Sequence, residues 1–202
     1  TILHNIVLSQ DYSCNGSGFI IAADNLTIDF AGYTLSGNGS GIGLNISGYN
    51  GTVIKNANID NFSYGIYVDP SKDQNITLNN ITNNSIGIYF IDVNDSFVVT
   101  NYITNNTLGI NLSTSDNNTI YDNYFNNTNN SFENDAATIW NVSNTSGTNI
   151  LGGSIIGGNF WHDYTGWDVD LDGIGDTEIP YNNSNNLTAG DSFPLTAVGK
   201  IA

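Results

Sequence analysis

Apolar side chains recur every 22 residues along the chain between Ile54 and Phe125. Two of the recurring positions hold large apolar residues: Ile54, Ile76, Val98 and Ile120 at one, and Ile59, Ile81, Ile103 and Phe125 at the other. A third position is a glycine followed by an apolar residue, in the pairs Gly43-Leu44, Gly65-Ile66, Gly87-Ile88 and Gly109-Ile110. A fixed period of about twenty residues with short apolar groups is typical of a solenoid of stacked coils.

Each coil contains three short apolar groups, for example Ile76 to Leu78, Ile81, and Ile86 to Phe90. Three groups per coil predict three short strands, and therefore three parallel sheets whose rungs are about 4.8 Å apart. Parallel crossovers are right-handed. The sequence thus predicts an all-β, right-handed, single-stranded parallel β-helix with 22-residue coils.

Asparagine recurs with the same period, and the repeated positions are Asn61, Asn83, Asn105 and Asn127, and also Asn79, Asn101 and Asn123. Amide side chains at coil corners can bond the coils above and below, which satisfies backbone groups that a bend leaves unpaired. The glycine of each coil is expected to permit a tight bend before the third strand.

The two ends of the chain depart from this regular pattern. Residues 1–35 predict short strands in slightly longer coils, and residues 126–147 predict a looser coil. A last strand is expected at Ile150-Leu151 and Ile155-Ile156. Aromatic residues and aspartates replace Asn and Ile from Gly157 onward. We therefore expect a β-helix over residues 1–157 and an aromatic and acidic segment over residues 158–202, with a calcium loop as its cap.

Charge limits the partners of this protein. The 202 residues include 19 acidic side chains but only 3 Lys and no Arg, which gives a net charge of −16. Such a surface repels phosphate backbones and anionic lipids, so nucleic acid and membrane-surface partners are disfavoured. Cations, neutral glycans or another copy of the same protein are better matched. The apolar content of 39%, with its regular spacing, argues against disorder.

No apolar stretch approaches the 18 or so residues of a membrane span, so we expect no direct span in this segment. The chain begins at Thr1 without Met or a signal peptide, and we expect it to be a mature or excised part of something longer. Asn-X-Ser/Thr sequons are numerous, for example at Asn45, Asn61, Asn105 and Asn186. Chance explains many of them, and glycosylation is expected at a few exposed ones in a secreted protein.

The sharpest local motif is DVDLDGIGD, residues 168–176. Its alternating positions match the first part of an EF-hand-type calcium loop, in which Gly173 supplies the sharp turn. The predicted Ca²⁺ ligands are Asp168, Asp170, Asp172, the main-chain carbonyl of Ile174, and Asp176. The ion would have a structural role, because this segment has little core of its own.

The motif departs from a full calcium loop at position 12, where Ile179 replaces the bidentate Glu. Glu178, Asp163 or Asp191 are alternatives for the missing oxygen ligand. A solvated acidic turn without an ion is the competing interpretation.

Asp73 and Asp95 are one period apart, so adjacent coils would bring two carboxylates together. Glycosidases use such pairs for acid and base catalysis. Both residues also lie in turn-like segments, where Asp is common, and the turn is the interpretation we favour. Tyr67 and Tyr89 also stack, either as a platform for a sugar or a partner, or as an aromatic pair that stabilises the sheet.

The repeats, together with GGNFWHDYTGWDVDLDGIGDTEIPY, the later DSFPL and the opening SCNGSGFIIAADNLTIDFAGYTLSGNG, resemble the NosD-like, carbohydrate-binding and sugar-hydrolase type of right-handed parallel β-helix proteins. The resemblance implies a secreted or cell-surface protein, of a type common in archaea. It also implies periplasmic copper chemistry or polysaccharide cleavage. This chain lacks Met, has His4, His162 and Cys14 as its only soft-metal ligands, and lacks the Arg that lyases of acidic polymers use.

The sequence therefore favours a non-enzymatic extracellular protein of an archaeal cell envelope: a surface-layer, sheath or adhesin module that is stabilised by Ca²⁺ and associates with itself or with envelope components. A glycan-binding module or a hydrolase of a neutral polysaccharide is the second hypothesis, with Tyr67, Tyr89, Asp73 and Asp95 on the active face. A viral spike or fibre domain is the third.

Overall fold

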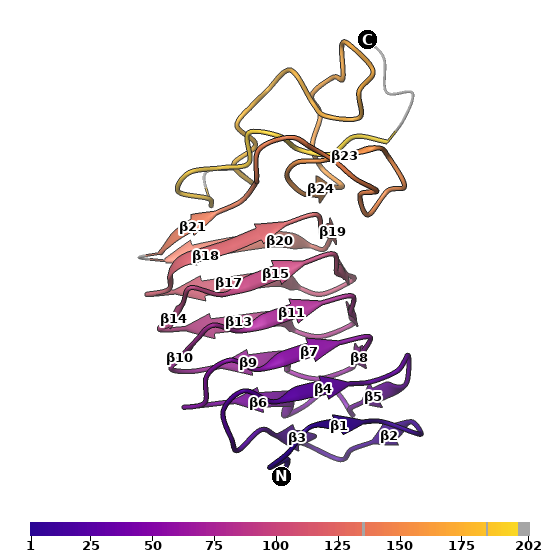
Figure 1. The fold of residues 1–202 in the computed structure, drawn as a ribbon, viewed down its shortest axis with the longest axis vertical. Helices are drawn as coiled ribbons and strands as arrows, with labels where there is room; N and C mark the ends of the chain where they lie inside the picture. Colours follow the sequence, from indigo (N-terminus) through magenta and orange to yellow (C-terminus); the bar gives the residue numbers. More distant parts are fainter. Residues whose placement is uncertain (135, 185, 198–202) are drawn as a thin grey trace.

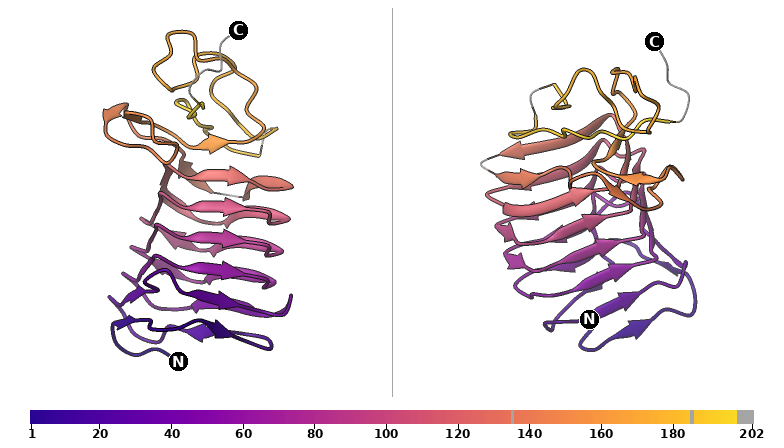
Figure 2. Two further views of the ribbon diagram at one scale, coloured as in Figure 1. Left: turned by 90° about the vertical axis from the view of Figure 1, so that its right-hand side faces the viewer. Right: turned by 45° about the horizontal axis from the view of Figure 1, so that its top comes forward.

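The protein is an all-β solenoid in the computed structural model, which describes residues 1–134, 136–184 and 186–197. Every regular element in these ranges is a strand and none is a helix. The coils stack along one axis, with the N-terminus at one end and an irregular C-terminal segment over the other (Figure 1). Figure 2 shows the same stack from two further sides. The predicted parallel β-helix with three main sheets is confirmed.

Sheet 1 and sheet 2 each contain seven parallel strands. The strands of sheet 1 are β1 (Ile6–Val7), β4 (Thr27–Asp29), β7 (Val53–Lys55), β11 (Asn75–Thr77), β15 (Phe97–Val99), β18 (Asp116–Tyr121) and β21 (Ala137–Ile139). The strands of sheet 2 are β2 (Tyr12–Ser13), β5 (Thr34–Ser36), β8 (Asn58–Asp60), β12 (Asn80–Thr82), β16 (Tyr102–Thr104), β19 (Tyr124–Asn126) and β24 (Phe160–Trp161).

Sheet 3 contains six parallel strands, and two short strand pairs complete the structure. The strands of sheet 3 are β3 (Phe19–Ile20), β6 (Ile42–Ile46), β9 (Tyr64–Val68), β13 (Ile86–Ile91), β17 (Leu108–Ser113) and β20 (Asn129–Asn134). The parallel pair is β10 (Ser71–Lys72) with β14 (Val93–Asn94), and the antiparallel pair is β22 (Thr145–Ser146) with β23 (Ile155–Ile156).

The 22-residue period is the register of the sheets. Ile76 pairs with Ile54 below it and with Val98 above it, and Val98 pairs in turn with Ile120. All four side chains are fully buried. Each such side chain contributes about 1.5 to 3 kcal/mol when it is removed from water, so every coil adds a similar increment to one continuous core. Earlier coils are longer where β5 pairs with β8 and β4 with β7.

The recurring asparagines have two different roles. Asn61, Asn83 and Asn105 have φ of 62°, 56° and 57°, in the left-handed region that Asn tolerates best after Gly. They therefore form turns and do not lie inside the coil. The residues that follow two of them, Asn84 and Asn106, are buried and form hydrogen bonds between coils. The prediction that Asn127 continues the turn position is wrong. One residue is dropped in that coil, so Asn127 accepts the bond from Asn106.

Two further sequence predictions need correction. The repeated glycines lie within the third strand and not before it, since Gly87 is the second residue of β13. A Cβ at Gly87 would approach the carbonyl oxygen of Gly109 to 2.5 Å, so glycine is needed for close stacking of coils. Leu78 is not part of a core strand: it follows β11 with a φ of 58°, and 54% of it is exposed.

The C-terminal segment returns to the solenoid after an insertion. The predicted strand at Ile150-Leu151 is absent, because these residues form a turn between β22 and β23. Strand β24 then pairs with β19 and continues sheet 2. The remaining described residues lie over the end of the stack with few strand pairings. The boundary at residue 157 therefore precedes a strand of the solenoid, and residues 198–202 of the predicted second segment lie outside the described ranges.

Candidate functional site

An asparagine ladder runs through the corner between sheets 1 and 2 and reaches the C-terminal segment. The side-chain oxygen of Asn101 accepts bonds from the backbone N–H and the side-chain amide of Asn79, at 2.9 and 3.0 Å. Asn123 repeats this for Asn101, and Asn159 repeats it for Asn123. Each amide also donates to a carbonyl, such as that of Ile76. The ladder therefore satisfies backbone groups that the tight corner leaves unpaired.

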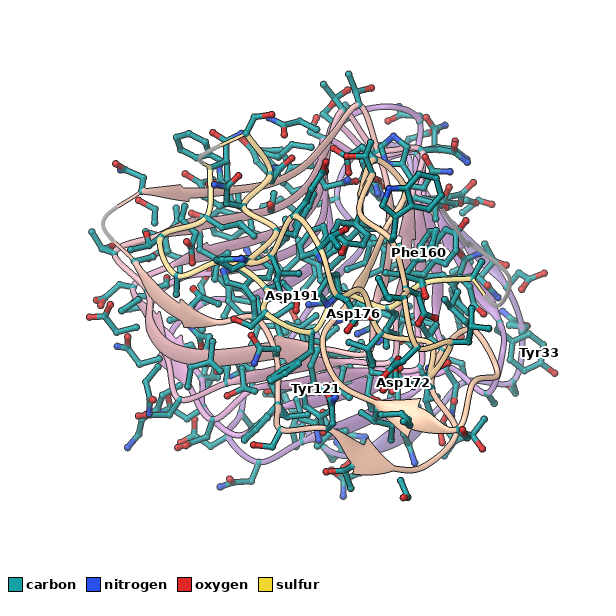
Figure 3. All side chains as sticks on the ribbon, turned by 90° about the horizontal axis from the view of Figure 1, so that it is seen from above. Tyr33, Tyr121, Phe160, Asp172, Asp176 and Asp191 are labelled. Carbon is teal, nitrogen blue, oxygen red and sulfur yellow. The ribbon has the colours of Figure 1, made fainter. Side chains whose placement is uncertain are left out.

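Asp191 ends this ladder. Its Oδ2 accepts bonds from the backbone N–H of Asn159 at 2.7 Å and from Nε1 of Trp161 at 2.9 Å, and its Oδ1 accepts the N–H of Phe193. Seen along the axis, Asp191 lies over the middle of the coil stack (Figure 3). Burial raises the pKa of this fully buried carboxyl to about 6, and the bonds that it accepts oppose that rise. Asp191 thus takes the place of the next asparagine.

Aromatic rings continue the core into the C-terminal segment. Trp161 stacks on Phe125 with ring centroids 4.6 Å apart, and on its other side it stacks on Tyr181, also at 4.6 Å. Burial is the first cause that raises the pKa of the Tyr181 hydroxyl, which donates to Asp163 at 2.8 Å. These contacts make residues 158–184 and 186–197 a cap that covers the end of the solenoid.

A second asparagine ladder, through Asn84 and Asn106, also ends on the cap. Asn127 accepts the bond from Asn106, and Asn130 accepts the bond from Asn127. The side-chain amide of Asn130 then donates to Oδ1 of Asp163 at 2.8 Å. Both ladders therefore finish at a carboxylate of the cap.

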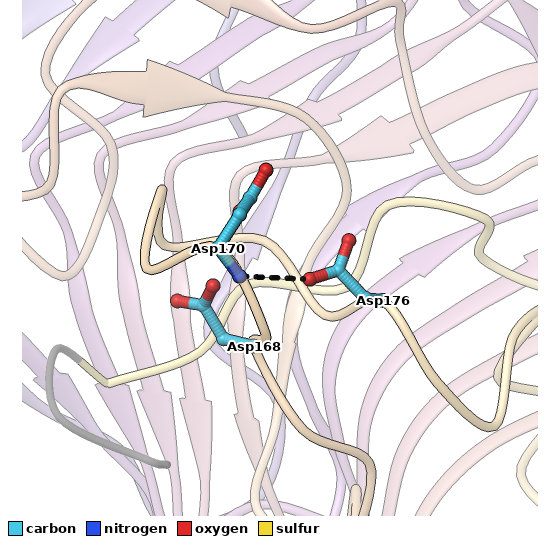
Figure 4. Close-up of side chains that lie close together, drawn as sticks. All are labelled: Asp168, Asp170 and Asp176. Carbon is cyan, nitrogen blue, oxygen red and sulfur yellow. Dashed lines mark hydrogen bonds between the residues drawn. The ribbon is translucent and has the colours of Figure 1, made fainter.

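The acidic loop of the cap brings three of the predicted metal ligands together. The carboxylates of Asp168, Asp170 and Asp176 each offer an oxygen, and these oxygens lie within 4.8 Å of one another (Figure 4). Asp168 is buried, whereas the other two are exposed. Oxygen donors at such distances suit a hard divalent cation such as Ca²⁺. Within the described ranges this is the one such group of His, Cys, Asp or Glu side chains.

The loop is folded by its own carboxylates. Asp168 accepts the N–H of Gly173 at 2.9 Å, and Asp176 accepts the N–H of Val169 at 2.7 Å. Gly173 has a φ of 94°, which agrees with the sharp turn predicted there. The Thr196 hydroxyl donates to Asp168 at 3.1 Å, so the loop is joined to the segment that carries Asp191.

Asp172 does not join the group of three. Its Oδ1 accepts the N–H of Ile174 at 2.8 Å, and the carbonyl of Ile174 stays a predicted ligand. Burial raises the pKa of Asp172, and the neighbouring negative charges of Asp170, Asp168 and Asp176 raise it further. A cation in the loop would relieve that repulsion.

The three alternatives for the missing calcium ligand have other partners. Glu178 accepts a hydrogen bond from the hydroxyl of Thr165, Asp163 accepts the bond from Tyr181, and Asp191 ends the ladder. None of them belongs to the carboxylate group within the residues that the structure describes.

Asp73 and Asp95 lie one above the other in left-handed turns, with φ of 57° and 53°. Asn117 follows with a φ of 57°, and its amide donates to Asp95 at 2.5 Å. Both aspartates are exposed, and Lys72 lies 3.9 Å from Asp73. The turn geometry accounts for these residues, and their catalytic role stays a prediction.

Tyr67 and Tyr89 pair one above the other on the outer face of sheet 3, with centroids 5.7 Å apart, but their planes meet edge to face at 83° and are not stacked. Tyr64 joins them and lies 5.7 Å from each ring. The Tyr67 hydroxyl donates to Asp69 at 3.0 Å. Burial is the largest cause that raises the pKa of Tyr67 to about 12, and the hydrogen bond to Asp69 is the second. The cluster offers an aromatic surface, although the sequence predicted only two of its members.

The sequence did not predict the cleft over the corner between sheets 1 and 2, which has a volume of about 580 Å³. Leu78, Tyr102 and Ile150 form its apolar part, and Asn58 and Asn80 contribute amides. The hydroxyl of Tyr102 donates to the carbonyl of Ile150 at 3.1 Å, which holds the insertion between β22 and β23 against the cleft. Ile150 comes from outside the repeat, so the period gave no signal for this cleft.

The histidines and the cysteine are dispersed. His4 and Cys14 flank β1 and β2 in the first coil, whereas His162 follows β24 at the opposite end of the stack. Nδ1 of His162 lies 3.2 Å from the amide of Asn130. No helix in the described part of the chain has the length and apolar character needed to cross a bilayer.

Comparison with known proteins gives one family. The sequence model of the family described as "Periplasmic copper-binding protein (NosD)" matches residues 4–166. No curated protein and no solved structure matches the chain. The matched range covers the solenoid and β24 and ends before the acidic loop.

Proposed function

The chain belongs to the NosD family, and we propose that it is an extracellular structural module of a cell envelope, stabilised by Ca²⁺ in its cap. A surface layer, a sheath or an adhesin is the setting that we infer for it. The family description names the periplasm, which supports a role outside the cytoplasm. The observation that carries the proposal is the group of three carboxylates in a cap on which both asparagine ladders end.

Copper, which the family description names, does not fit the residues present. Copper sites use imidazole, thiolate and thioether ligands. This chain has 2 His, 1 Cys and no Met, and the histidines lie at opposite ends of the stack. The acidic loop offers oxygen ligands only, and it lies beyond the residues that match the family. We therefore propose that this loop binds a hard cation and not copper.

Calcium binding is tested by titration calorimetry of chelator-treated protein with Ca²⁺ and, separately, with Mg²⁺ and Cu²⁺. One Ca²⁺ per chain, with a rise in melting temperature, is expected. Asp168→Asn and Asp170→Asn should abolish the heat of binding, whereas Asp116→Asn, which removes a distant exposed carboxylate, should not. Unchanged melting and no heat with Ca²⁺ would contradict the proposal.

Self-association is the second part of the proposed function. A net charge of −16 repels neighbouring copies, and a divalent cation can bridge acidic surfaces. Sedimentation at equal ionic strength, with Ca²⁺ or with Na⁺ alone, separates bridging from general screening. Larger species with Ca²⁺ alone are expected; monomers at every calcium and protein concentration would argue against assembly.

A second candidate function is favoured by the aromatic cluster of Tyr64, Tyr67 and Tyr89. These half-buried rings lie on the outer face of sheet 3, and aromatic rings suit the faces of sugars, so this surface is a candidate site for a neutral glycan. A glycan array with wild type and Tyr89→Ala tests binding. A reducing-sugar assay with Asp73→Asn and Asp95→Asn tests hydrolysis. Absence of both signals would remove this candidate.

A further inference from the structure

Every corner between sheet 2 and sheet 3 carries an Asn-X-Ser/Thr sequon. Five of these corners follow β2, β5, β8, β12 and β16. The sixth begins at Asn126, the last residue of β19. The sequon asparagines are Asn15, Asn38, Asn61, Asn83, Asn105 and Asn126. Each of these asparagines is exposed. The sequon is kept in the last coil even though one residue is dropped there, where Asn126-Asn127-Thr128 replaces the pattern of Asn105-Asn106-Thr107.

The fold explains the asparagines of this corner but not the hydroxyls. Left-handed turns favour Asn83 and Asn105, and the interior ladder requires Asn84 and Asn106. The Ser85, Thr107 and Thr128 hydroxyls, in contrast, make no hydrogen bond in the described structure, and all three residues are exposed. At the first two corners the hydroxyls do have partners, since Ser17 accepts the N–H of Ile42 and Ser40 donates to Asn38. Folding therefore gives no reason for the hydroxyl at the corners of Asn83, Asn105 and Asn126.

Sequons at the corner between sheet 3 and sheet 1 differ. The hydroxyl residues of the sequons at Asn50 and Asn94 are Thr52 and Ser96, which are buried. Ser96 accepts the N–H of Gln74 at 2.9 Å and is part of the core ladder. The asparagine side chains are hydrogen-bonded as well. The side-chain oxygen of Asn94 accepts the N–H of Asp116, and that of Asn50 accepts the N–H of Lys72. These sequons are by-products of folding.

We propose that the corner between sheets 2 and 3 is the acceptor surface for N-linked oligosaccharides, with the free amides of Asn83, Asn105 and Asn126 as the main sites. This inference rests on the extracytoplasmic location in the proposed function. In the reaction, the amide nitrogen forms a bond to the anomeric carbon of a lipid-linked oligosaccharide. The bond from that carbon to the phosphate oxygen breaks, the lipid phosphate leaves, and the amide loses one proton to a base of the transferase.

The stacking of coils limits how many sites are filled at once. Adjacent corners are about 4.8 Å apart, which is narrower than a branched oligosaccharide. Glycans on neighbouring rungs therefore exclude one another, and each molecule carries them on non-adjacent coils. Removing one sequon should raise the occupancy of the next.

The test uses the folded chain, a single-subunit oligosaccharyltransferase that accepts Asn-X-Ser/Thr, and a lipid-linked oligosaccharide. Enzymatic release in ¹⁸O water marks each formerly glycosylated asparagine for mass spectrometry of chymotryptic peptides. Modification at Asn83, Asn105 and Asn126 should exceed that at Asn50 and Asn94 at least tenfold. In denatured protein the difference should disappear. Equal rates in the folded protein, or unmodified corners, would overturn the proposal.

Matched variants separate the acceptor role from folding. Ser85→Ala should remove the label at Asn83, raise it at Asn105 and leave the unfolding midpoint unchanged. Ser96→Ala should lower the midpoint without changing the corner labels. A lower midpoint for Ser85→Ala would show that the hydroxyl serves the fold and would overturn the proposal. The calcium titration of the same preparation reports on the proposed function independently.

Discussion

Asp191 is a buried carboxylate that performs a structural task usually given to an amide. The end of this asparagine ladder requires only hydrogen-bond acceptors, because the groups that bond to it are donors. These donors are the N–H of Asn159, Nε1 of Trp161 and the N–H of Phe193. A carboxylate supplies two acceptor oxygens and no donor, which an asparagine cannot do. The cost is a desolvated charge.

The pKa of Asp191 predicts a pH-dependent stability. Burial raises it from 3.8 to about 6, so the folded carboxyl holds a proton at pH values where the unfolded one has lost it. The free energy of unfolding should therefore fall as pH rises from about 4 to 6, and the loss from this residue is on the order of 3 kcal/mol. Urea unfolding at several pH values measures it.

Asp191→Asn isolates this effect from the other carboxylates. The variant should be destabilised by about 1 to 3 kcal/mol, because an amide hydrogen would face a donor. Its stability should also depend less on pH between 4 and 6 than that of the wild type. Identical pH profiles would show that Asp191 is not the titrating group. Burial also raises the pKa of Asp122, but that contribution is present in both proteins.

The strands themselves are very short, and the corner ladders hold them in register. Asn101 accepts two bonds from Asn79 and donates to the carbonyls of Ile76 and Val99. Asn80, the residue that follows Asn79, is exposed, and its side chain makes one long contact of 3.5 Å with Asn58. Composition alone does not distinguish these two asparagines.

Asn101→Ala should reduce the free energy of unfolding by about 3 kcal/mol, because it leaves buried N–H and carbonyl groups unpaired. Asn80→Ala is the control and should change it by less than about 0.5 kcal/mol. Denaturant unfolding with an unchanged m-value measures both. Equal effects would mean that the ladder adds nothing beyond an ordinary surface amide.

Gly87→Ala probes the close approach of successive coils. The added Cβ would lie 2.5 Å from the carbonyl oxygen of Gly109, a backbone atom of the next coil that cannot move without breaking the stacking. We expect a loss of about 2 to 4 kcal/mol, as for an overpacked core. Thermal melting would reveal it, and a melting temperature equal to that of the wild type would contradict the stacking argument.

The whole molecule combines a repetitive stack with a cap that has little regular structure. The acidic loop reaches the solenoid through Thr196, Leu195 and finally Asp191, so a cation in the loop would stabilise the end of the stack. Chelation should therefore accelerate hydrogen exchange first in residues 160–192. Strands β11 to β13 in the middle of the stack should be unaffected. Uniform acceleration, or none, would contradict a calcium-stabilised cap.

The sequence by itself determined the solenoid, because parallel stacking places residues one period apart in contact, and a period is visible without coordinates. It also identified the acidic loop, because its converging carboxylates lie within nine residues of one another in the sequence. It misassigned Leu78, which lies one residue beyond the end of β11. It also misassigned Asn127, which occupies a ladder position because that coil is one residue shorter.

The tertiary structure decided what joins residues that share no register. Asp191 meets Asn159 across 32 positions, and Ile150 closes a cleft against Tyr102 across 48 positions. The same limit applies to the corner hydroxyls: their sequence pattern is plain, but only the fold shows that Ser85 is exposed and Ser96 buried. Contacts fixed by loops rather than by the period depend on the path of the chain, which no repeat encodes.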